Sequence, residues 1–154
     1  MSFVNEQNIP SPEEVKDIVP FPRHLAGVWT KRDAELKEIL AGKSDKFIVI
    51  VGPCSASDED AVCDYISRLA KINEDVKEKL FIIPRIYTNK PRTTGDGYKG
   101  MLHQPDPEKA TNIYEGVLAL RKMHIRAVSE SHLTSADEML YPENLVYISD
   151  VLGY

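Results

Sequence analysis

The feature that most constrains the fold is a pair of unbroken apolar segments, 47–51 and 80–83. Segments of apolar, mostly β-branched residues without polar alternation are typical of strands buried on both faces, as in a parallel sheet. The first segment ends at a Gly-Pro turn, and the second continues through Arg85 to Tyr87. We therefore predict two buried parallel strands.

Helices are predicted before and between these strands. One runs roughly from Val28 to Leu40, and Gly42 follows it as a C-terminal stop. Between the strands, Ser57 is expected to cap a long helix. The apolar residues of this long helix recur at helical spacing, namely Val62, Tyr65, Ile66, Leu69, Ile72 and Val76.

The two ends of the chain give weaker patterns. Residues 1–24 contain Pro10, Pro12, Pro20 and Pro22, which predict an extended, irregular arm. Asp106-Pro107 is a suitable cap and first residue for another helix, whose apolar positions are Ile113, Val117, Leu118 and Leu120. A third strand is expected over 135–140, and Pro142 is expected to open a last helix with Leu145, Ile148 and Leu152 on one face.

The order is thus a helix followed by three strand–helix units, which predicts a parallel α/β architecture with right-handed crossovers. Three units cannot close a barrel of eight, which typically needs about 250 residues. The sequence therefore indicates a truncated barrel: an N-terminal extension over 1–46, serving oligomerisation or regulation, and a truncated TIM-barrel domain over 47–154.

Composition excludes some classes of function. The net charge of -5 argues against nucleic acid or an anionic membrane as the main partner. No apolar stretch approaches the roughly 20 residues that span a bilayer, and the N-terminus lacks the pattern of a signal peptide. Two closely spaced cysteines, Cys54 and Cys63, favour free thiols or one metal ligand in a reducing cytoplasm.

Three segments follow predicted strands, where ligands bind in parallel α/β folds. The first is Gly52-Pro53-Cys54-Ser55, in which a thiolate held by a rigid turn could ligate a divalent metal. The alternative is a small buried cysteine in a tight turn.

The second segment runs from Arg85 to Thr94 and carries several donors for anions. Arg85 follows an apolar strand and would be costly to bury unless it met an anion. Lys90, Arg92 and the hydroxyls of Thr93 and Thr94 suit a phosphate. A solvated basic turn is the competing interpretation.

The third segment holds Asp137 and Glu138, two carboxylates on a predicted buried strand. One could face the barrel interior and act electrostatically while the other faces solvent, and a structural cap or ion-pair partner is an equal alternative. His24, His103, His124 and His132 share no metal-ligand spacing and are interpreted as surface or loop residues. Cys63 is expected to pack within its amphipathic helix, and Trp29 and Tyr87 are expected to be core or interface aromatics.

Together these residues resemble one family. Ile50-Val51-Gly52-Pro53-Cys54-Ser55, Pro84-Arg85-Ile86-Tyr87, Lys90-Pro91-Arg92-Thr93-Thr94 and Tyr98-Lys99-Gly100 occur in order and at similar spacing in class I 3-deoxy-D-arabino-heptulosonate 7-phosphate (DAHP) synthases, also called phospho-2-dehydro-3-deoxyheptonate aldolases. The stretch 133–144, LTSADEMLYPEN, is similar to the same family. The resemblance runs from about Phe21 to the end of the chain.

The resemblance implies a homo-oligomeric (β/α)8 barrel in the shikimate pathway of aromatic amino acid biosynthesis. Such an enzyme condenses phosphoenolpyruvate with erythrose 4-phosphate, releases phosphate and requires a divalent metal of the Mn, Fe, Co or Zn type. It also implies roles for individual residues: Cys54 as metal ligand, Lys90 as catalytic residue reaching both substrates, Arg85 and Glu138 at phosphoenolpyruvate, and Pro91, Arg92 and Thr93 at erythrose 4-phosphate. An aromatic amino acid inhibitor acting through the N-terminal extension is also implied.

Two other interpretations remain open. A non-catalytic remnant could serve only in oligomerisation or regulation of an intact synthase. The related 3-deoxy-octulosonate 8-phosphate synthases share the fold and the phosphoenolpyruvate chemistry, but the KPRTT loop and the long extension favour the first family. The family's other metal ligands would lie beyond Tyr154, so the chain alone is expected to be inactive.

Overall fold

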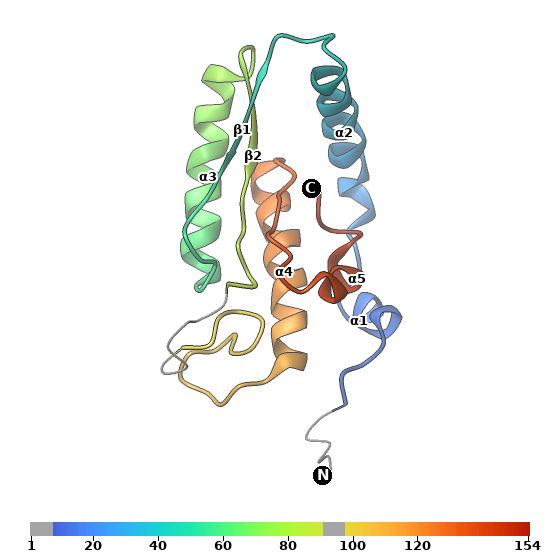
Figure 1. The fold of residues 1–154 in the computed structure, drawn as a ribbon, viewed down its shortest axis with the longest axis vertical. Coiled ribbons are helices and arrows are strands. Elements are labelled where there is room, and N and C mark those ends of the chain that lie inside the picture. Colours follow the sequence, from blue (N-terminus) through green and yellow to red (C-terminus); the bar gives the residue numbers. More distant parts are fainter. Residues whose placement is uncertain (1–7, 91–97) are drawn as a thin grey trace.

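The computed structural model describes residues 8–90 and 98–154. The described elements follow the order α1 (Pro12–Ile18), η1 (Arg23–Leu25), α2 (Ala26–Leu40), β1 (Phe47–Val51), α3 (Glu59–Val76), β2 (Leu80–Pro84), α4 (Ile113–Ser131), η2 (Pro142–Asn144) and α5 (Leu145–Ile148). The two strands lie side by side and parallel, in register from Phe47 opposite Leu80 to Val51 opposite Pro84 (Figure 1). The two expected strands are therefore present.

The third expected strand, 135–140, is reduced to a single parallel bridge between Ala136 and Arg85. Ile86 N–H donates to the Ala136 carbonyl at 2.8 Å, and Ala136 N–H donates to the Pro84 carbonyl at 2.8 Å. Beyond Ala136 the backbone finds other partners, since Glu138 N–H donates to the Asp137 side chain at 2.7 Å. The order of the parallel segments is nevertheless β1, β2, Ala136.

Burial on both faces holds for β2 but is wrong for β1. Four of the five residues of β2 are buried, whereas Phe47 and Ile50 of β1 are 70% and 59% exposed. Within the described part of the chain, β1 has a paired strand on one edge only, while β2 lies between β1 and Ala136. An apolar sequence predicts a strand, but neighbouring elements decide whether it is buried.

Helix starts depart from the sequence-based expectations in two places. The cap of α3 is Asp58, not Ser57, and its carboxylate accepts from Ala61 N–H at 2.8 Å. The helix expected at Asp106 begins at Ile113 with Asn112 as its cap. Asp106 instead closes a turn by accepting from Glu108 N–H at 3.0 Å.

Two more departures lie near the chain ends. Part of the arm expected to be irregular is helix α1, because Ser11 and Glu14 form a reciprocal capping box and Pro12 stands at the first helical position. The last helix is broken into the 3₁₀ turn η2 and the short α5. Helix α2 agrees with expectation and begins two residues earlier, at Ala26.

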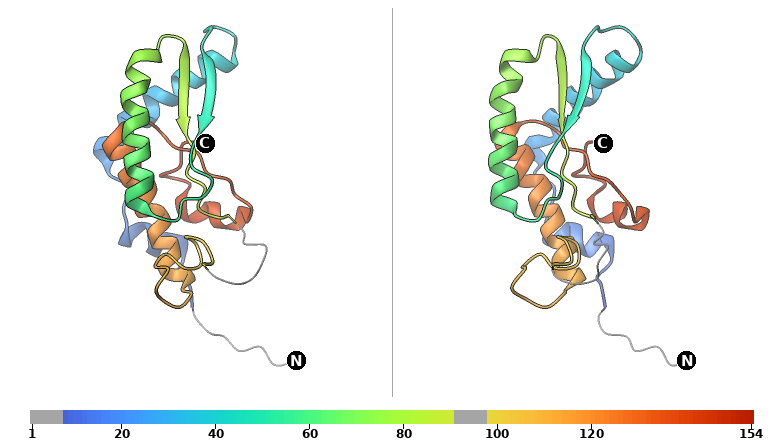
Figure 2. Two further views of the ribbon diagram at one scale, coloured as in Figure 1. Left: turned by 90° about the vertical axis from the view of Figure 1, so that its left-hand side faces the viewer. Right: turned by 60° about the vertical axis from the view of Figure 1, so that its left-hand side comes forward.

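The main core lies where α3 and α4 pack together beside the sheet, as the turned views show (Figure 2). Gly116 of α4 is needed for close packing, because a Cβ there would lie 1.8 Å from the Leu102 carbonyl oxygen. Leu36 and Ile39 of α2 pack with Phe81 of β2 in a smaller cluster. No described helix is both long and apolar enough to cross a bilayer.

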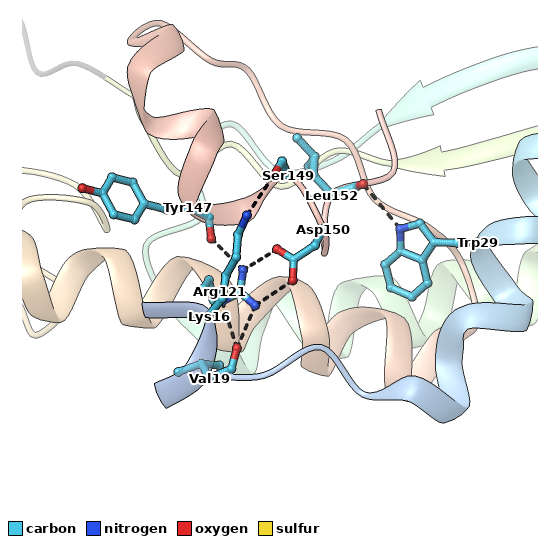
Figure 3. A network of polar contacts seen from close by, with 8 residues as sticks. All are labelled: Lys16, Val19, Trp29, Arg121, Tyr147, Ser149, Asp150 and Leu152. Carbon is cyan, nitrogen blue, oxygen red and sulfur yellow. Dashed lines mark hydrogen bonds and ion pairs between the residues drawn. The ribbon is translucent and has the colours of Figure 1, made fainter. Parts of the chain in front are cut away.

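Residues near α1 are fastened to the C-terminal segment by a buried arginine on α4 (Figure 3). Arg121 donates to the Val19 carbonyl at 2.7 and 2.9 Å and to the Tyr147 carbonyl at 2.6 Å. It also forms a two-pronged ion pair with Asp150 at 2.6 and 3.0 Å. We call Arg121, Val19, Tyr147 and Asp150 the clasp. The division into 1–46 and 47–154 stays a prediction, but described residues before 47 are packed against the rest.

Candidate functional site

The candidate site lies at the C-terminal ends of β1 and β2, where ligands bind in parallel α/β folds. The turn after β1 carries Cys54, the segment after β2 carries Arg85 and Lys90, and Glu138 follows the bridge at Ala136. Gly52 permits this meeting, because a Cβ at that position would lie 1.9 Å from the Arg85 carbonyl oxygen. No larger residue fits there without moving the backbone.

Arg85 meets its anion within the chain. Its guanidinium forms an ion pair with Glu138, and its other terminal nitrogen donates to the Pro53 carbonyl at 2.9 Å. The ring of Tyr87 lies 5.2 Å from the guanidinium carbon. Both members of the ion pair are partly exposed, with 25% of the Arg85 side chain and 45% of the Glu138 side chain accessible. The pair can therefore reach solvent and small ligands.

Lys90 reaches the adjacent residue of the same turn. Its ammonium group donates to the Cys54 carbonyl at 3.3 Å and contacts the Cys54 sulfur. Cys54 is exposed, so the interpretation as a buried turn cysteine is wrong. The thiolate is the form of cysteine that ligates metals and reacts with electrophiles, and the Lys90 ammonium group lies beside this sulfur.

Beneath these side chains lies a buried polar group that sequence reasoning missed in part. His124 was expected at the surface, yet its side chain and that of Asp137 are fully buried, with Nε2 3.4 Å from the carboxylate. Asp137 also accepts from the Thr88 N–H at 3.1 Å and from the Thr88 hydroxyl. Nδ1 of His124 lies 2.8 Å from the Ser135 hydroxyl oxygen. Of the two carboxylates, Asp137 is buried and Glu138 is exposed and paired with Arg85, which is the ion-pair alternative.

A signal for His124 was present in the sequence. Val117, Leu120 and Val128 lie three and eight residues apart along α4, as the helical period requires for one face, and all three are buried. His124 falls on the same stripe, so the helical period placed it inside. Its partner Asp137 comes from another segment of the chain, which periodicity does not reveal.

The buried group extends along the segment after β2 and to η2. Asn89 Nδ2 donates to the Thr88 hydroxyl at 3.0 Å, and Asn144 Nδ2 donates to the Asn89 side-chain oxygen at 3.3 Å. Thr88 and Asn89 are buried. Side-chain hydrogen bonds within this buried group therefore hold Thr88 and Asn89, the two residues before Lys90.

The described residues do not complete a metal site. Residues 8–90 and 98–154 contain no cluster of three or more His, Cys, Asp or Glu side chains able to hold a metal ion, whereas catalytic zinc sites use three protein ligands. Cys54 is one suitable ligand. Cys63 is not, because burial raises the pKa of its thiol to about 11, and its expected packing role is confirmed. Pro91, Arg92 and Thr93 lie outside the described residues.

A hollow of about 600 Å³ lies at the opposite end of the strands, beside the starts of β1 and β2. Four of its charged groups form two ion pairs. Lys46 lies 2.6 Å from Glu35, and Lys77 lies 2.6 Å from Glu74. We place the candidate site at the strand ends, where side chains of different segments converge, and not in this hollow.

Comparison with known proteins shows the family of this chain. The model of the DAHP synthetase I family matches residues 22–154. The phenylalanine-inhibited phospho-2-dehydro-3-deoxyheptonate aldolase of Saccharomyces cerevisiae is 42% identical over 113 residues, which cover 73% of this chain and 30% of the yeast protein. The Phe-sensitive enzyme of Escherichia coli K12 is 30% identical over 151 residues, covering 92% of this chain and 43% of that protein.

A solved structure gives the same result. The phospho-2-dehydro-3-deoxyheptonate aldolase of Francisella tularensis SCHU S4 superposes with a TM-score of 0.86 at 27% identity, covering 98% of this chain and 44% of that chain. The chain thus spans less than half the length of these relatives. Since the family model covers most of the sequence, the chain belongs to the DAHP synthetase I family.

Proposed function

We propose that this chain supplies part of the active site of a DAHP synthase, which condenses phosphoenolpyruvate with erythrose 4-phosphate to DAHP and phosphate. The observation that carries the proposal is the convergence of two cations on one turn. Arg85 donates to the carbonyl of Pro53, and Lys90 donates to the carbonyl of the next residue, Cys54. Arg85 and Lys90 therefore hold their positive charges beside neighbouring residues of one turn, an arrangement that suits the binding of two anionic substrates.

Each side chain has a role that its contacts support. A guanidinium has five N–H groups, and Arg85 uses two terminal nitrogens on Glu138 and Pro53, so further donors can hold phosphoenolpyruvate. Lys90 can donate to the oxyanion that develops when the aldehyde of erythrose 4-phosphate is attacked. Holding both substrates converts a bimolecular encounter into a positioned reaction.

The remaining roles follow from the family resemblance. Glu138 keeps Arg85 oriented at the phosphoenolpyruvate site, and Pro91, Arg92 and Thr93 line the erythrose 4-phosphate site. Cys54 is proposed as one ligand of a divalent metal. When bound, that metal supplies Lewis-acid chemistry. Homo-oligomerisation and inhibition by an aromatic amino acid belong to the same proposal, since relatives are named as phenylalanine- or tyrosine-inhibited.

A chimera tests the proposal. Residues 22–154 of this chain replace the matching segment of the E. coli Phe-sensitive synthase, and phosphate release is followed with both substrates and manganese. We expect turnover, and Arg85→Ala in the chimera should lower it by about 100-fold or more, as removal of one transition-state donor does elsewhere. The matched control is Arg68→Ala, since Arg68 lies in an exposed ion pair on α3. A folded chimera without turnover, or equal effects of the two changes, contradicts the proposal.

A second candidate function is non-catalytic association with another chain. The observation that favours it is the exposure of Phe47 and Ile50 on β1. Full activity of the chimera would show that the residues are competent for synthesis. If the chimera folds but has no turnover, while the unmodified E. coli synthase is active, the association role is favoured.

A further inference from the structure

The buried carboxylate of Asp137 lies between the two segments that carry the proposed site. One oxygen accepts from the backbone N–H of Thr88 at 3.1 Å and from that of Glu138 at 2.7 Å. The other accepts from the Thr88 hydroxyl and lies 3.4 Å from Nε2 of His124. The carboxylate therefore meets four donors and has no access to solvent.

We propose that Asp137, held by His124, is a positioning residue that sets Lys90 and Glu138 in place relative to each other. Thr88 precedes Lys90 by two residues, and Glu138 directly follows Asp137. One carboxylate thus bonds the backbone of both segments. The inference deepens the proposed function and rests on it for the role of Lys90 and Glu138 in binding substrate.

The hydrogen-bond pattern explains why an aspartate is used rather than an asparagine. A buried polar group is costly unless it is hydrogen-bonded, and both carboxylate oxygens accept bonds from the surrounding donors. When the Ser135 hydroxyl donates to Nδ1 of His124, the Nε2–H of the ring faces the carboxylate. A neutral amide at this position would turn an NH2 group toward either the Thr88 and His124 donors or the two backbone N–H groups.

The first test compares the same chemical change at two sites in the 154-residue chain. Asp137→Asn alters the positioning residue, and Asp150→Asn alters the clasp, which lies outside the proposed site. Phosphoenolpyruvate affinity is measured by calorimetry where each variant is folded. We expect Asp137→Asn to weaken binding at least tenfold and Asp150→Asn to stay within twofold of wild type, whatever each does to stability. Equal losses in the two variants overturn the inference, because they indicate a general loss of structure.

The second test needs no substrate. The alkylation rate of Cys54 reports the Lys90 contact, and Lys90→Met gives the rate without that cation. We expect Asp137→Asn to move the rate most of the way from the wild-type value toward the Lys90→Met value, with no change in Asp150→Asn. A wild-type rate in Asp137→Asn, or no difference between wild type and Lys90→Met, overturns the inference.

Milder variants keep the test decisive if Asp137→Asn fails to fold. Thr88→Val removes the hydroxyl donor at nearly constant volume, and Thr88→Ser retains it. Thr88→Val should shift the Cys54 alkylation rate toward that of Lys90→Met, and Thr88→Ser should restore it. Equal rates for these two variants overturn the inference. If wild type binds no phosphoenolpyruvate, the proposed function fails at this chain, while the alkylation rates still decide the positioning role.

Discussion

Arg121 and Arg85 each pair with a carboxylate, but their surroundings differ. Arg121 is fully buried, and its five hydrogen bonds all go to the chain itself. Arg85 is a quarter exposed, and its partner Glu138 is nearly half exposed. Arg121 joins helices, whereas Arg85 stands at a strand end beside a turn. Arg121 therefore stabilises the fold, and Arg85 can exchange its protein partners for a ligand.

Burial separates charges that stabilise the fold from charges that can bind a ligand. Removing one member of a buried pair leaves an unpaired charge and unsatisfied carbonyls, which typically costs about 3–5 kcal/mol. A partly exposed pair contributes only about 0–1 kcal/mol, because water competes for both groups. Substitution of Arg121 should therefore lower the free energy of unfolding, and substitution of Arg85 should mainly lower the affinity for substrate.

The largest effect on stability is expected at the clasp. Arg121→Met leaves Asp150 and the Val19 and Tyr147 carbonyls without their donor, so the free energy of unfolding should fall by about 3–5 kcal/mol. Urea unfolding followed by circular dichroism measures this. Lys37→Ala, in an exposed ion pair within α2, is the control and should change stability by less than about 0.5 kcal/mol. A loss below about 1 kcal/mol for Arg121→Met contradicts the structural role of the clasp.

A second effect concerns the exposed strand. Phe47 and Ile50 place apolar surface on an edge strand, which favours association. We expect the chain to self-associate as its concentration rises. Ile50→Lys should weaken that association by about 2 kcal/mol, the value of burying one large aliphatic side chain. Light scattering after size exclusion measures it.

The control for the strand is an isoleucine of similar exposure elsewhere. Ile72 on α3 is 53% exposed, and Ile72→Lys should leave the association unchanged. Equal effects of the two substitutions would show that the contact is not specific to β1. A monomer at every concentration would show that the β1 edge is satisfied in some other way.

The two cysteines repeat the contrast between buried and exposed groups. Burial raises the pKa of Cys63 to about 11, so at pH 8 only about one thiol in a thousand is ionised. Its alkylation rate should rise about tenfold per pH unit up to that pKa. Cys54, exposed beside Lys90, should react first, and Cys54→Ser should abolish the fast phase. A single phase with two equivalent thiols would contradict the burial of Cys63.

The same pKa fixes a direction for stability. A cysteine thiol in water ordinarily has a pKa near 9.0, and the pKa of Cys63 in the folded chain is higher. As pH rises past about 9, the unfolded chain loses this proton before the folded chain does. The contribution of Cys63 is therefore fully present below that pH and is lost between about 9 and 11. In Cys63→Ala this component of the pH dependence should disappear from urea unfolding curves.

The smallest effect on stability is expected at Arg85. Arg85→Gln removes a partly exposed ion pair, so the free energy of unfolding should fall by less than about 1 kcal/mol. Urea unfolding beside Arg121→Met gives the comparison directly. A loss as large as that of Arg121→Met would make Arg85 a structural residue and remove the contrast between the two.

Much of the fold was predictable because its signals are local. The apolar segments gave β1 and β2, and helical periodicity gave α2 and α3. The start of α3 was wrong by one residue because Ser57 and Asp58 are both good caps. The third strand was wrong because the Asp137 side chain bonds the backbone N–H of Glu138, a competition that pattern does not reveal.

The site was predictable to the extent that strand ends meet at one edge of a sheet. On that basis Cys54, Arg85 and Lys90 were expected to lie close together, and in the structure they do. Their roles as ligands stay predictions. The pairing of His124 with Asp137 was missed because it depends on tertiary packing between α4 and the segment after Ala136. Helical periodicity predicts that a side chain is buried, but it does not predict which residue the side chain will hydrogen-bond.

We propose that Arg85 binds substrate, whereas Arg121 only stabilises the fold, and one titration tests this. Phosphoenolpyruvate is titrated by calorimetry into the wild-type chain, Arg85→Gln and the control Arg68→Gln. We expect wild type and Arg68→Gln to bind with affinities within twofold of each other. Arg85→Gln should bind at least tenfold more weakly, since a lost charged hydrogen bond costs about 1.5–3 kcal/mol. Equal binding by all three chains, or none by wild type, would contradict it.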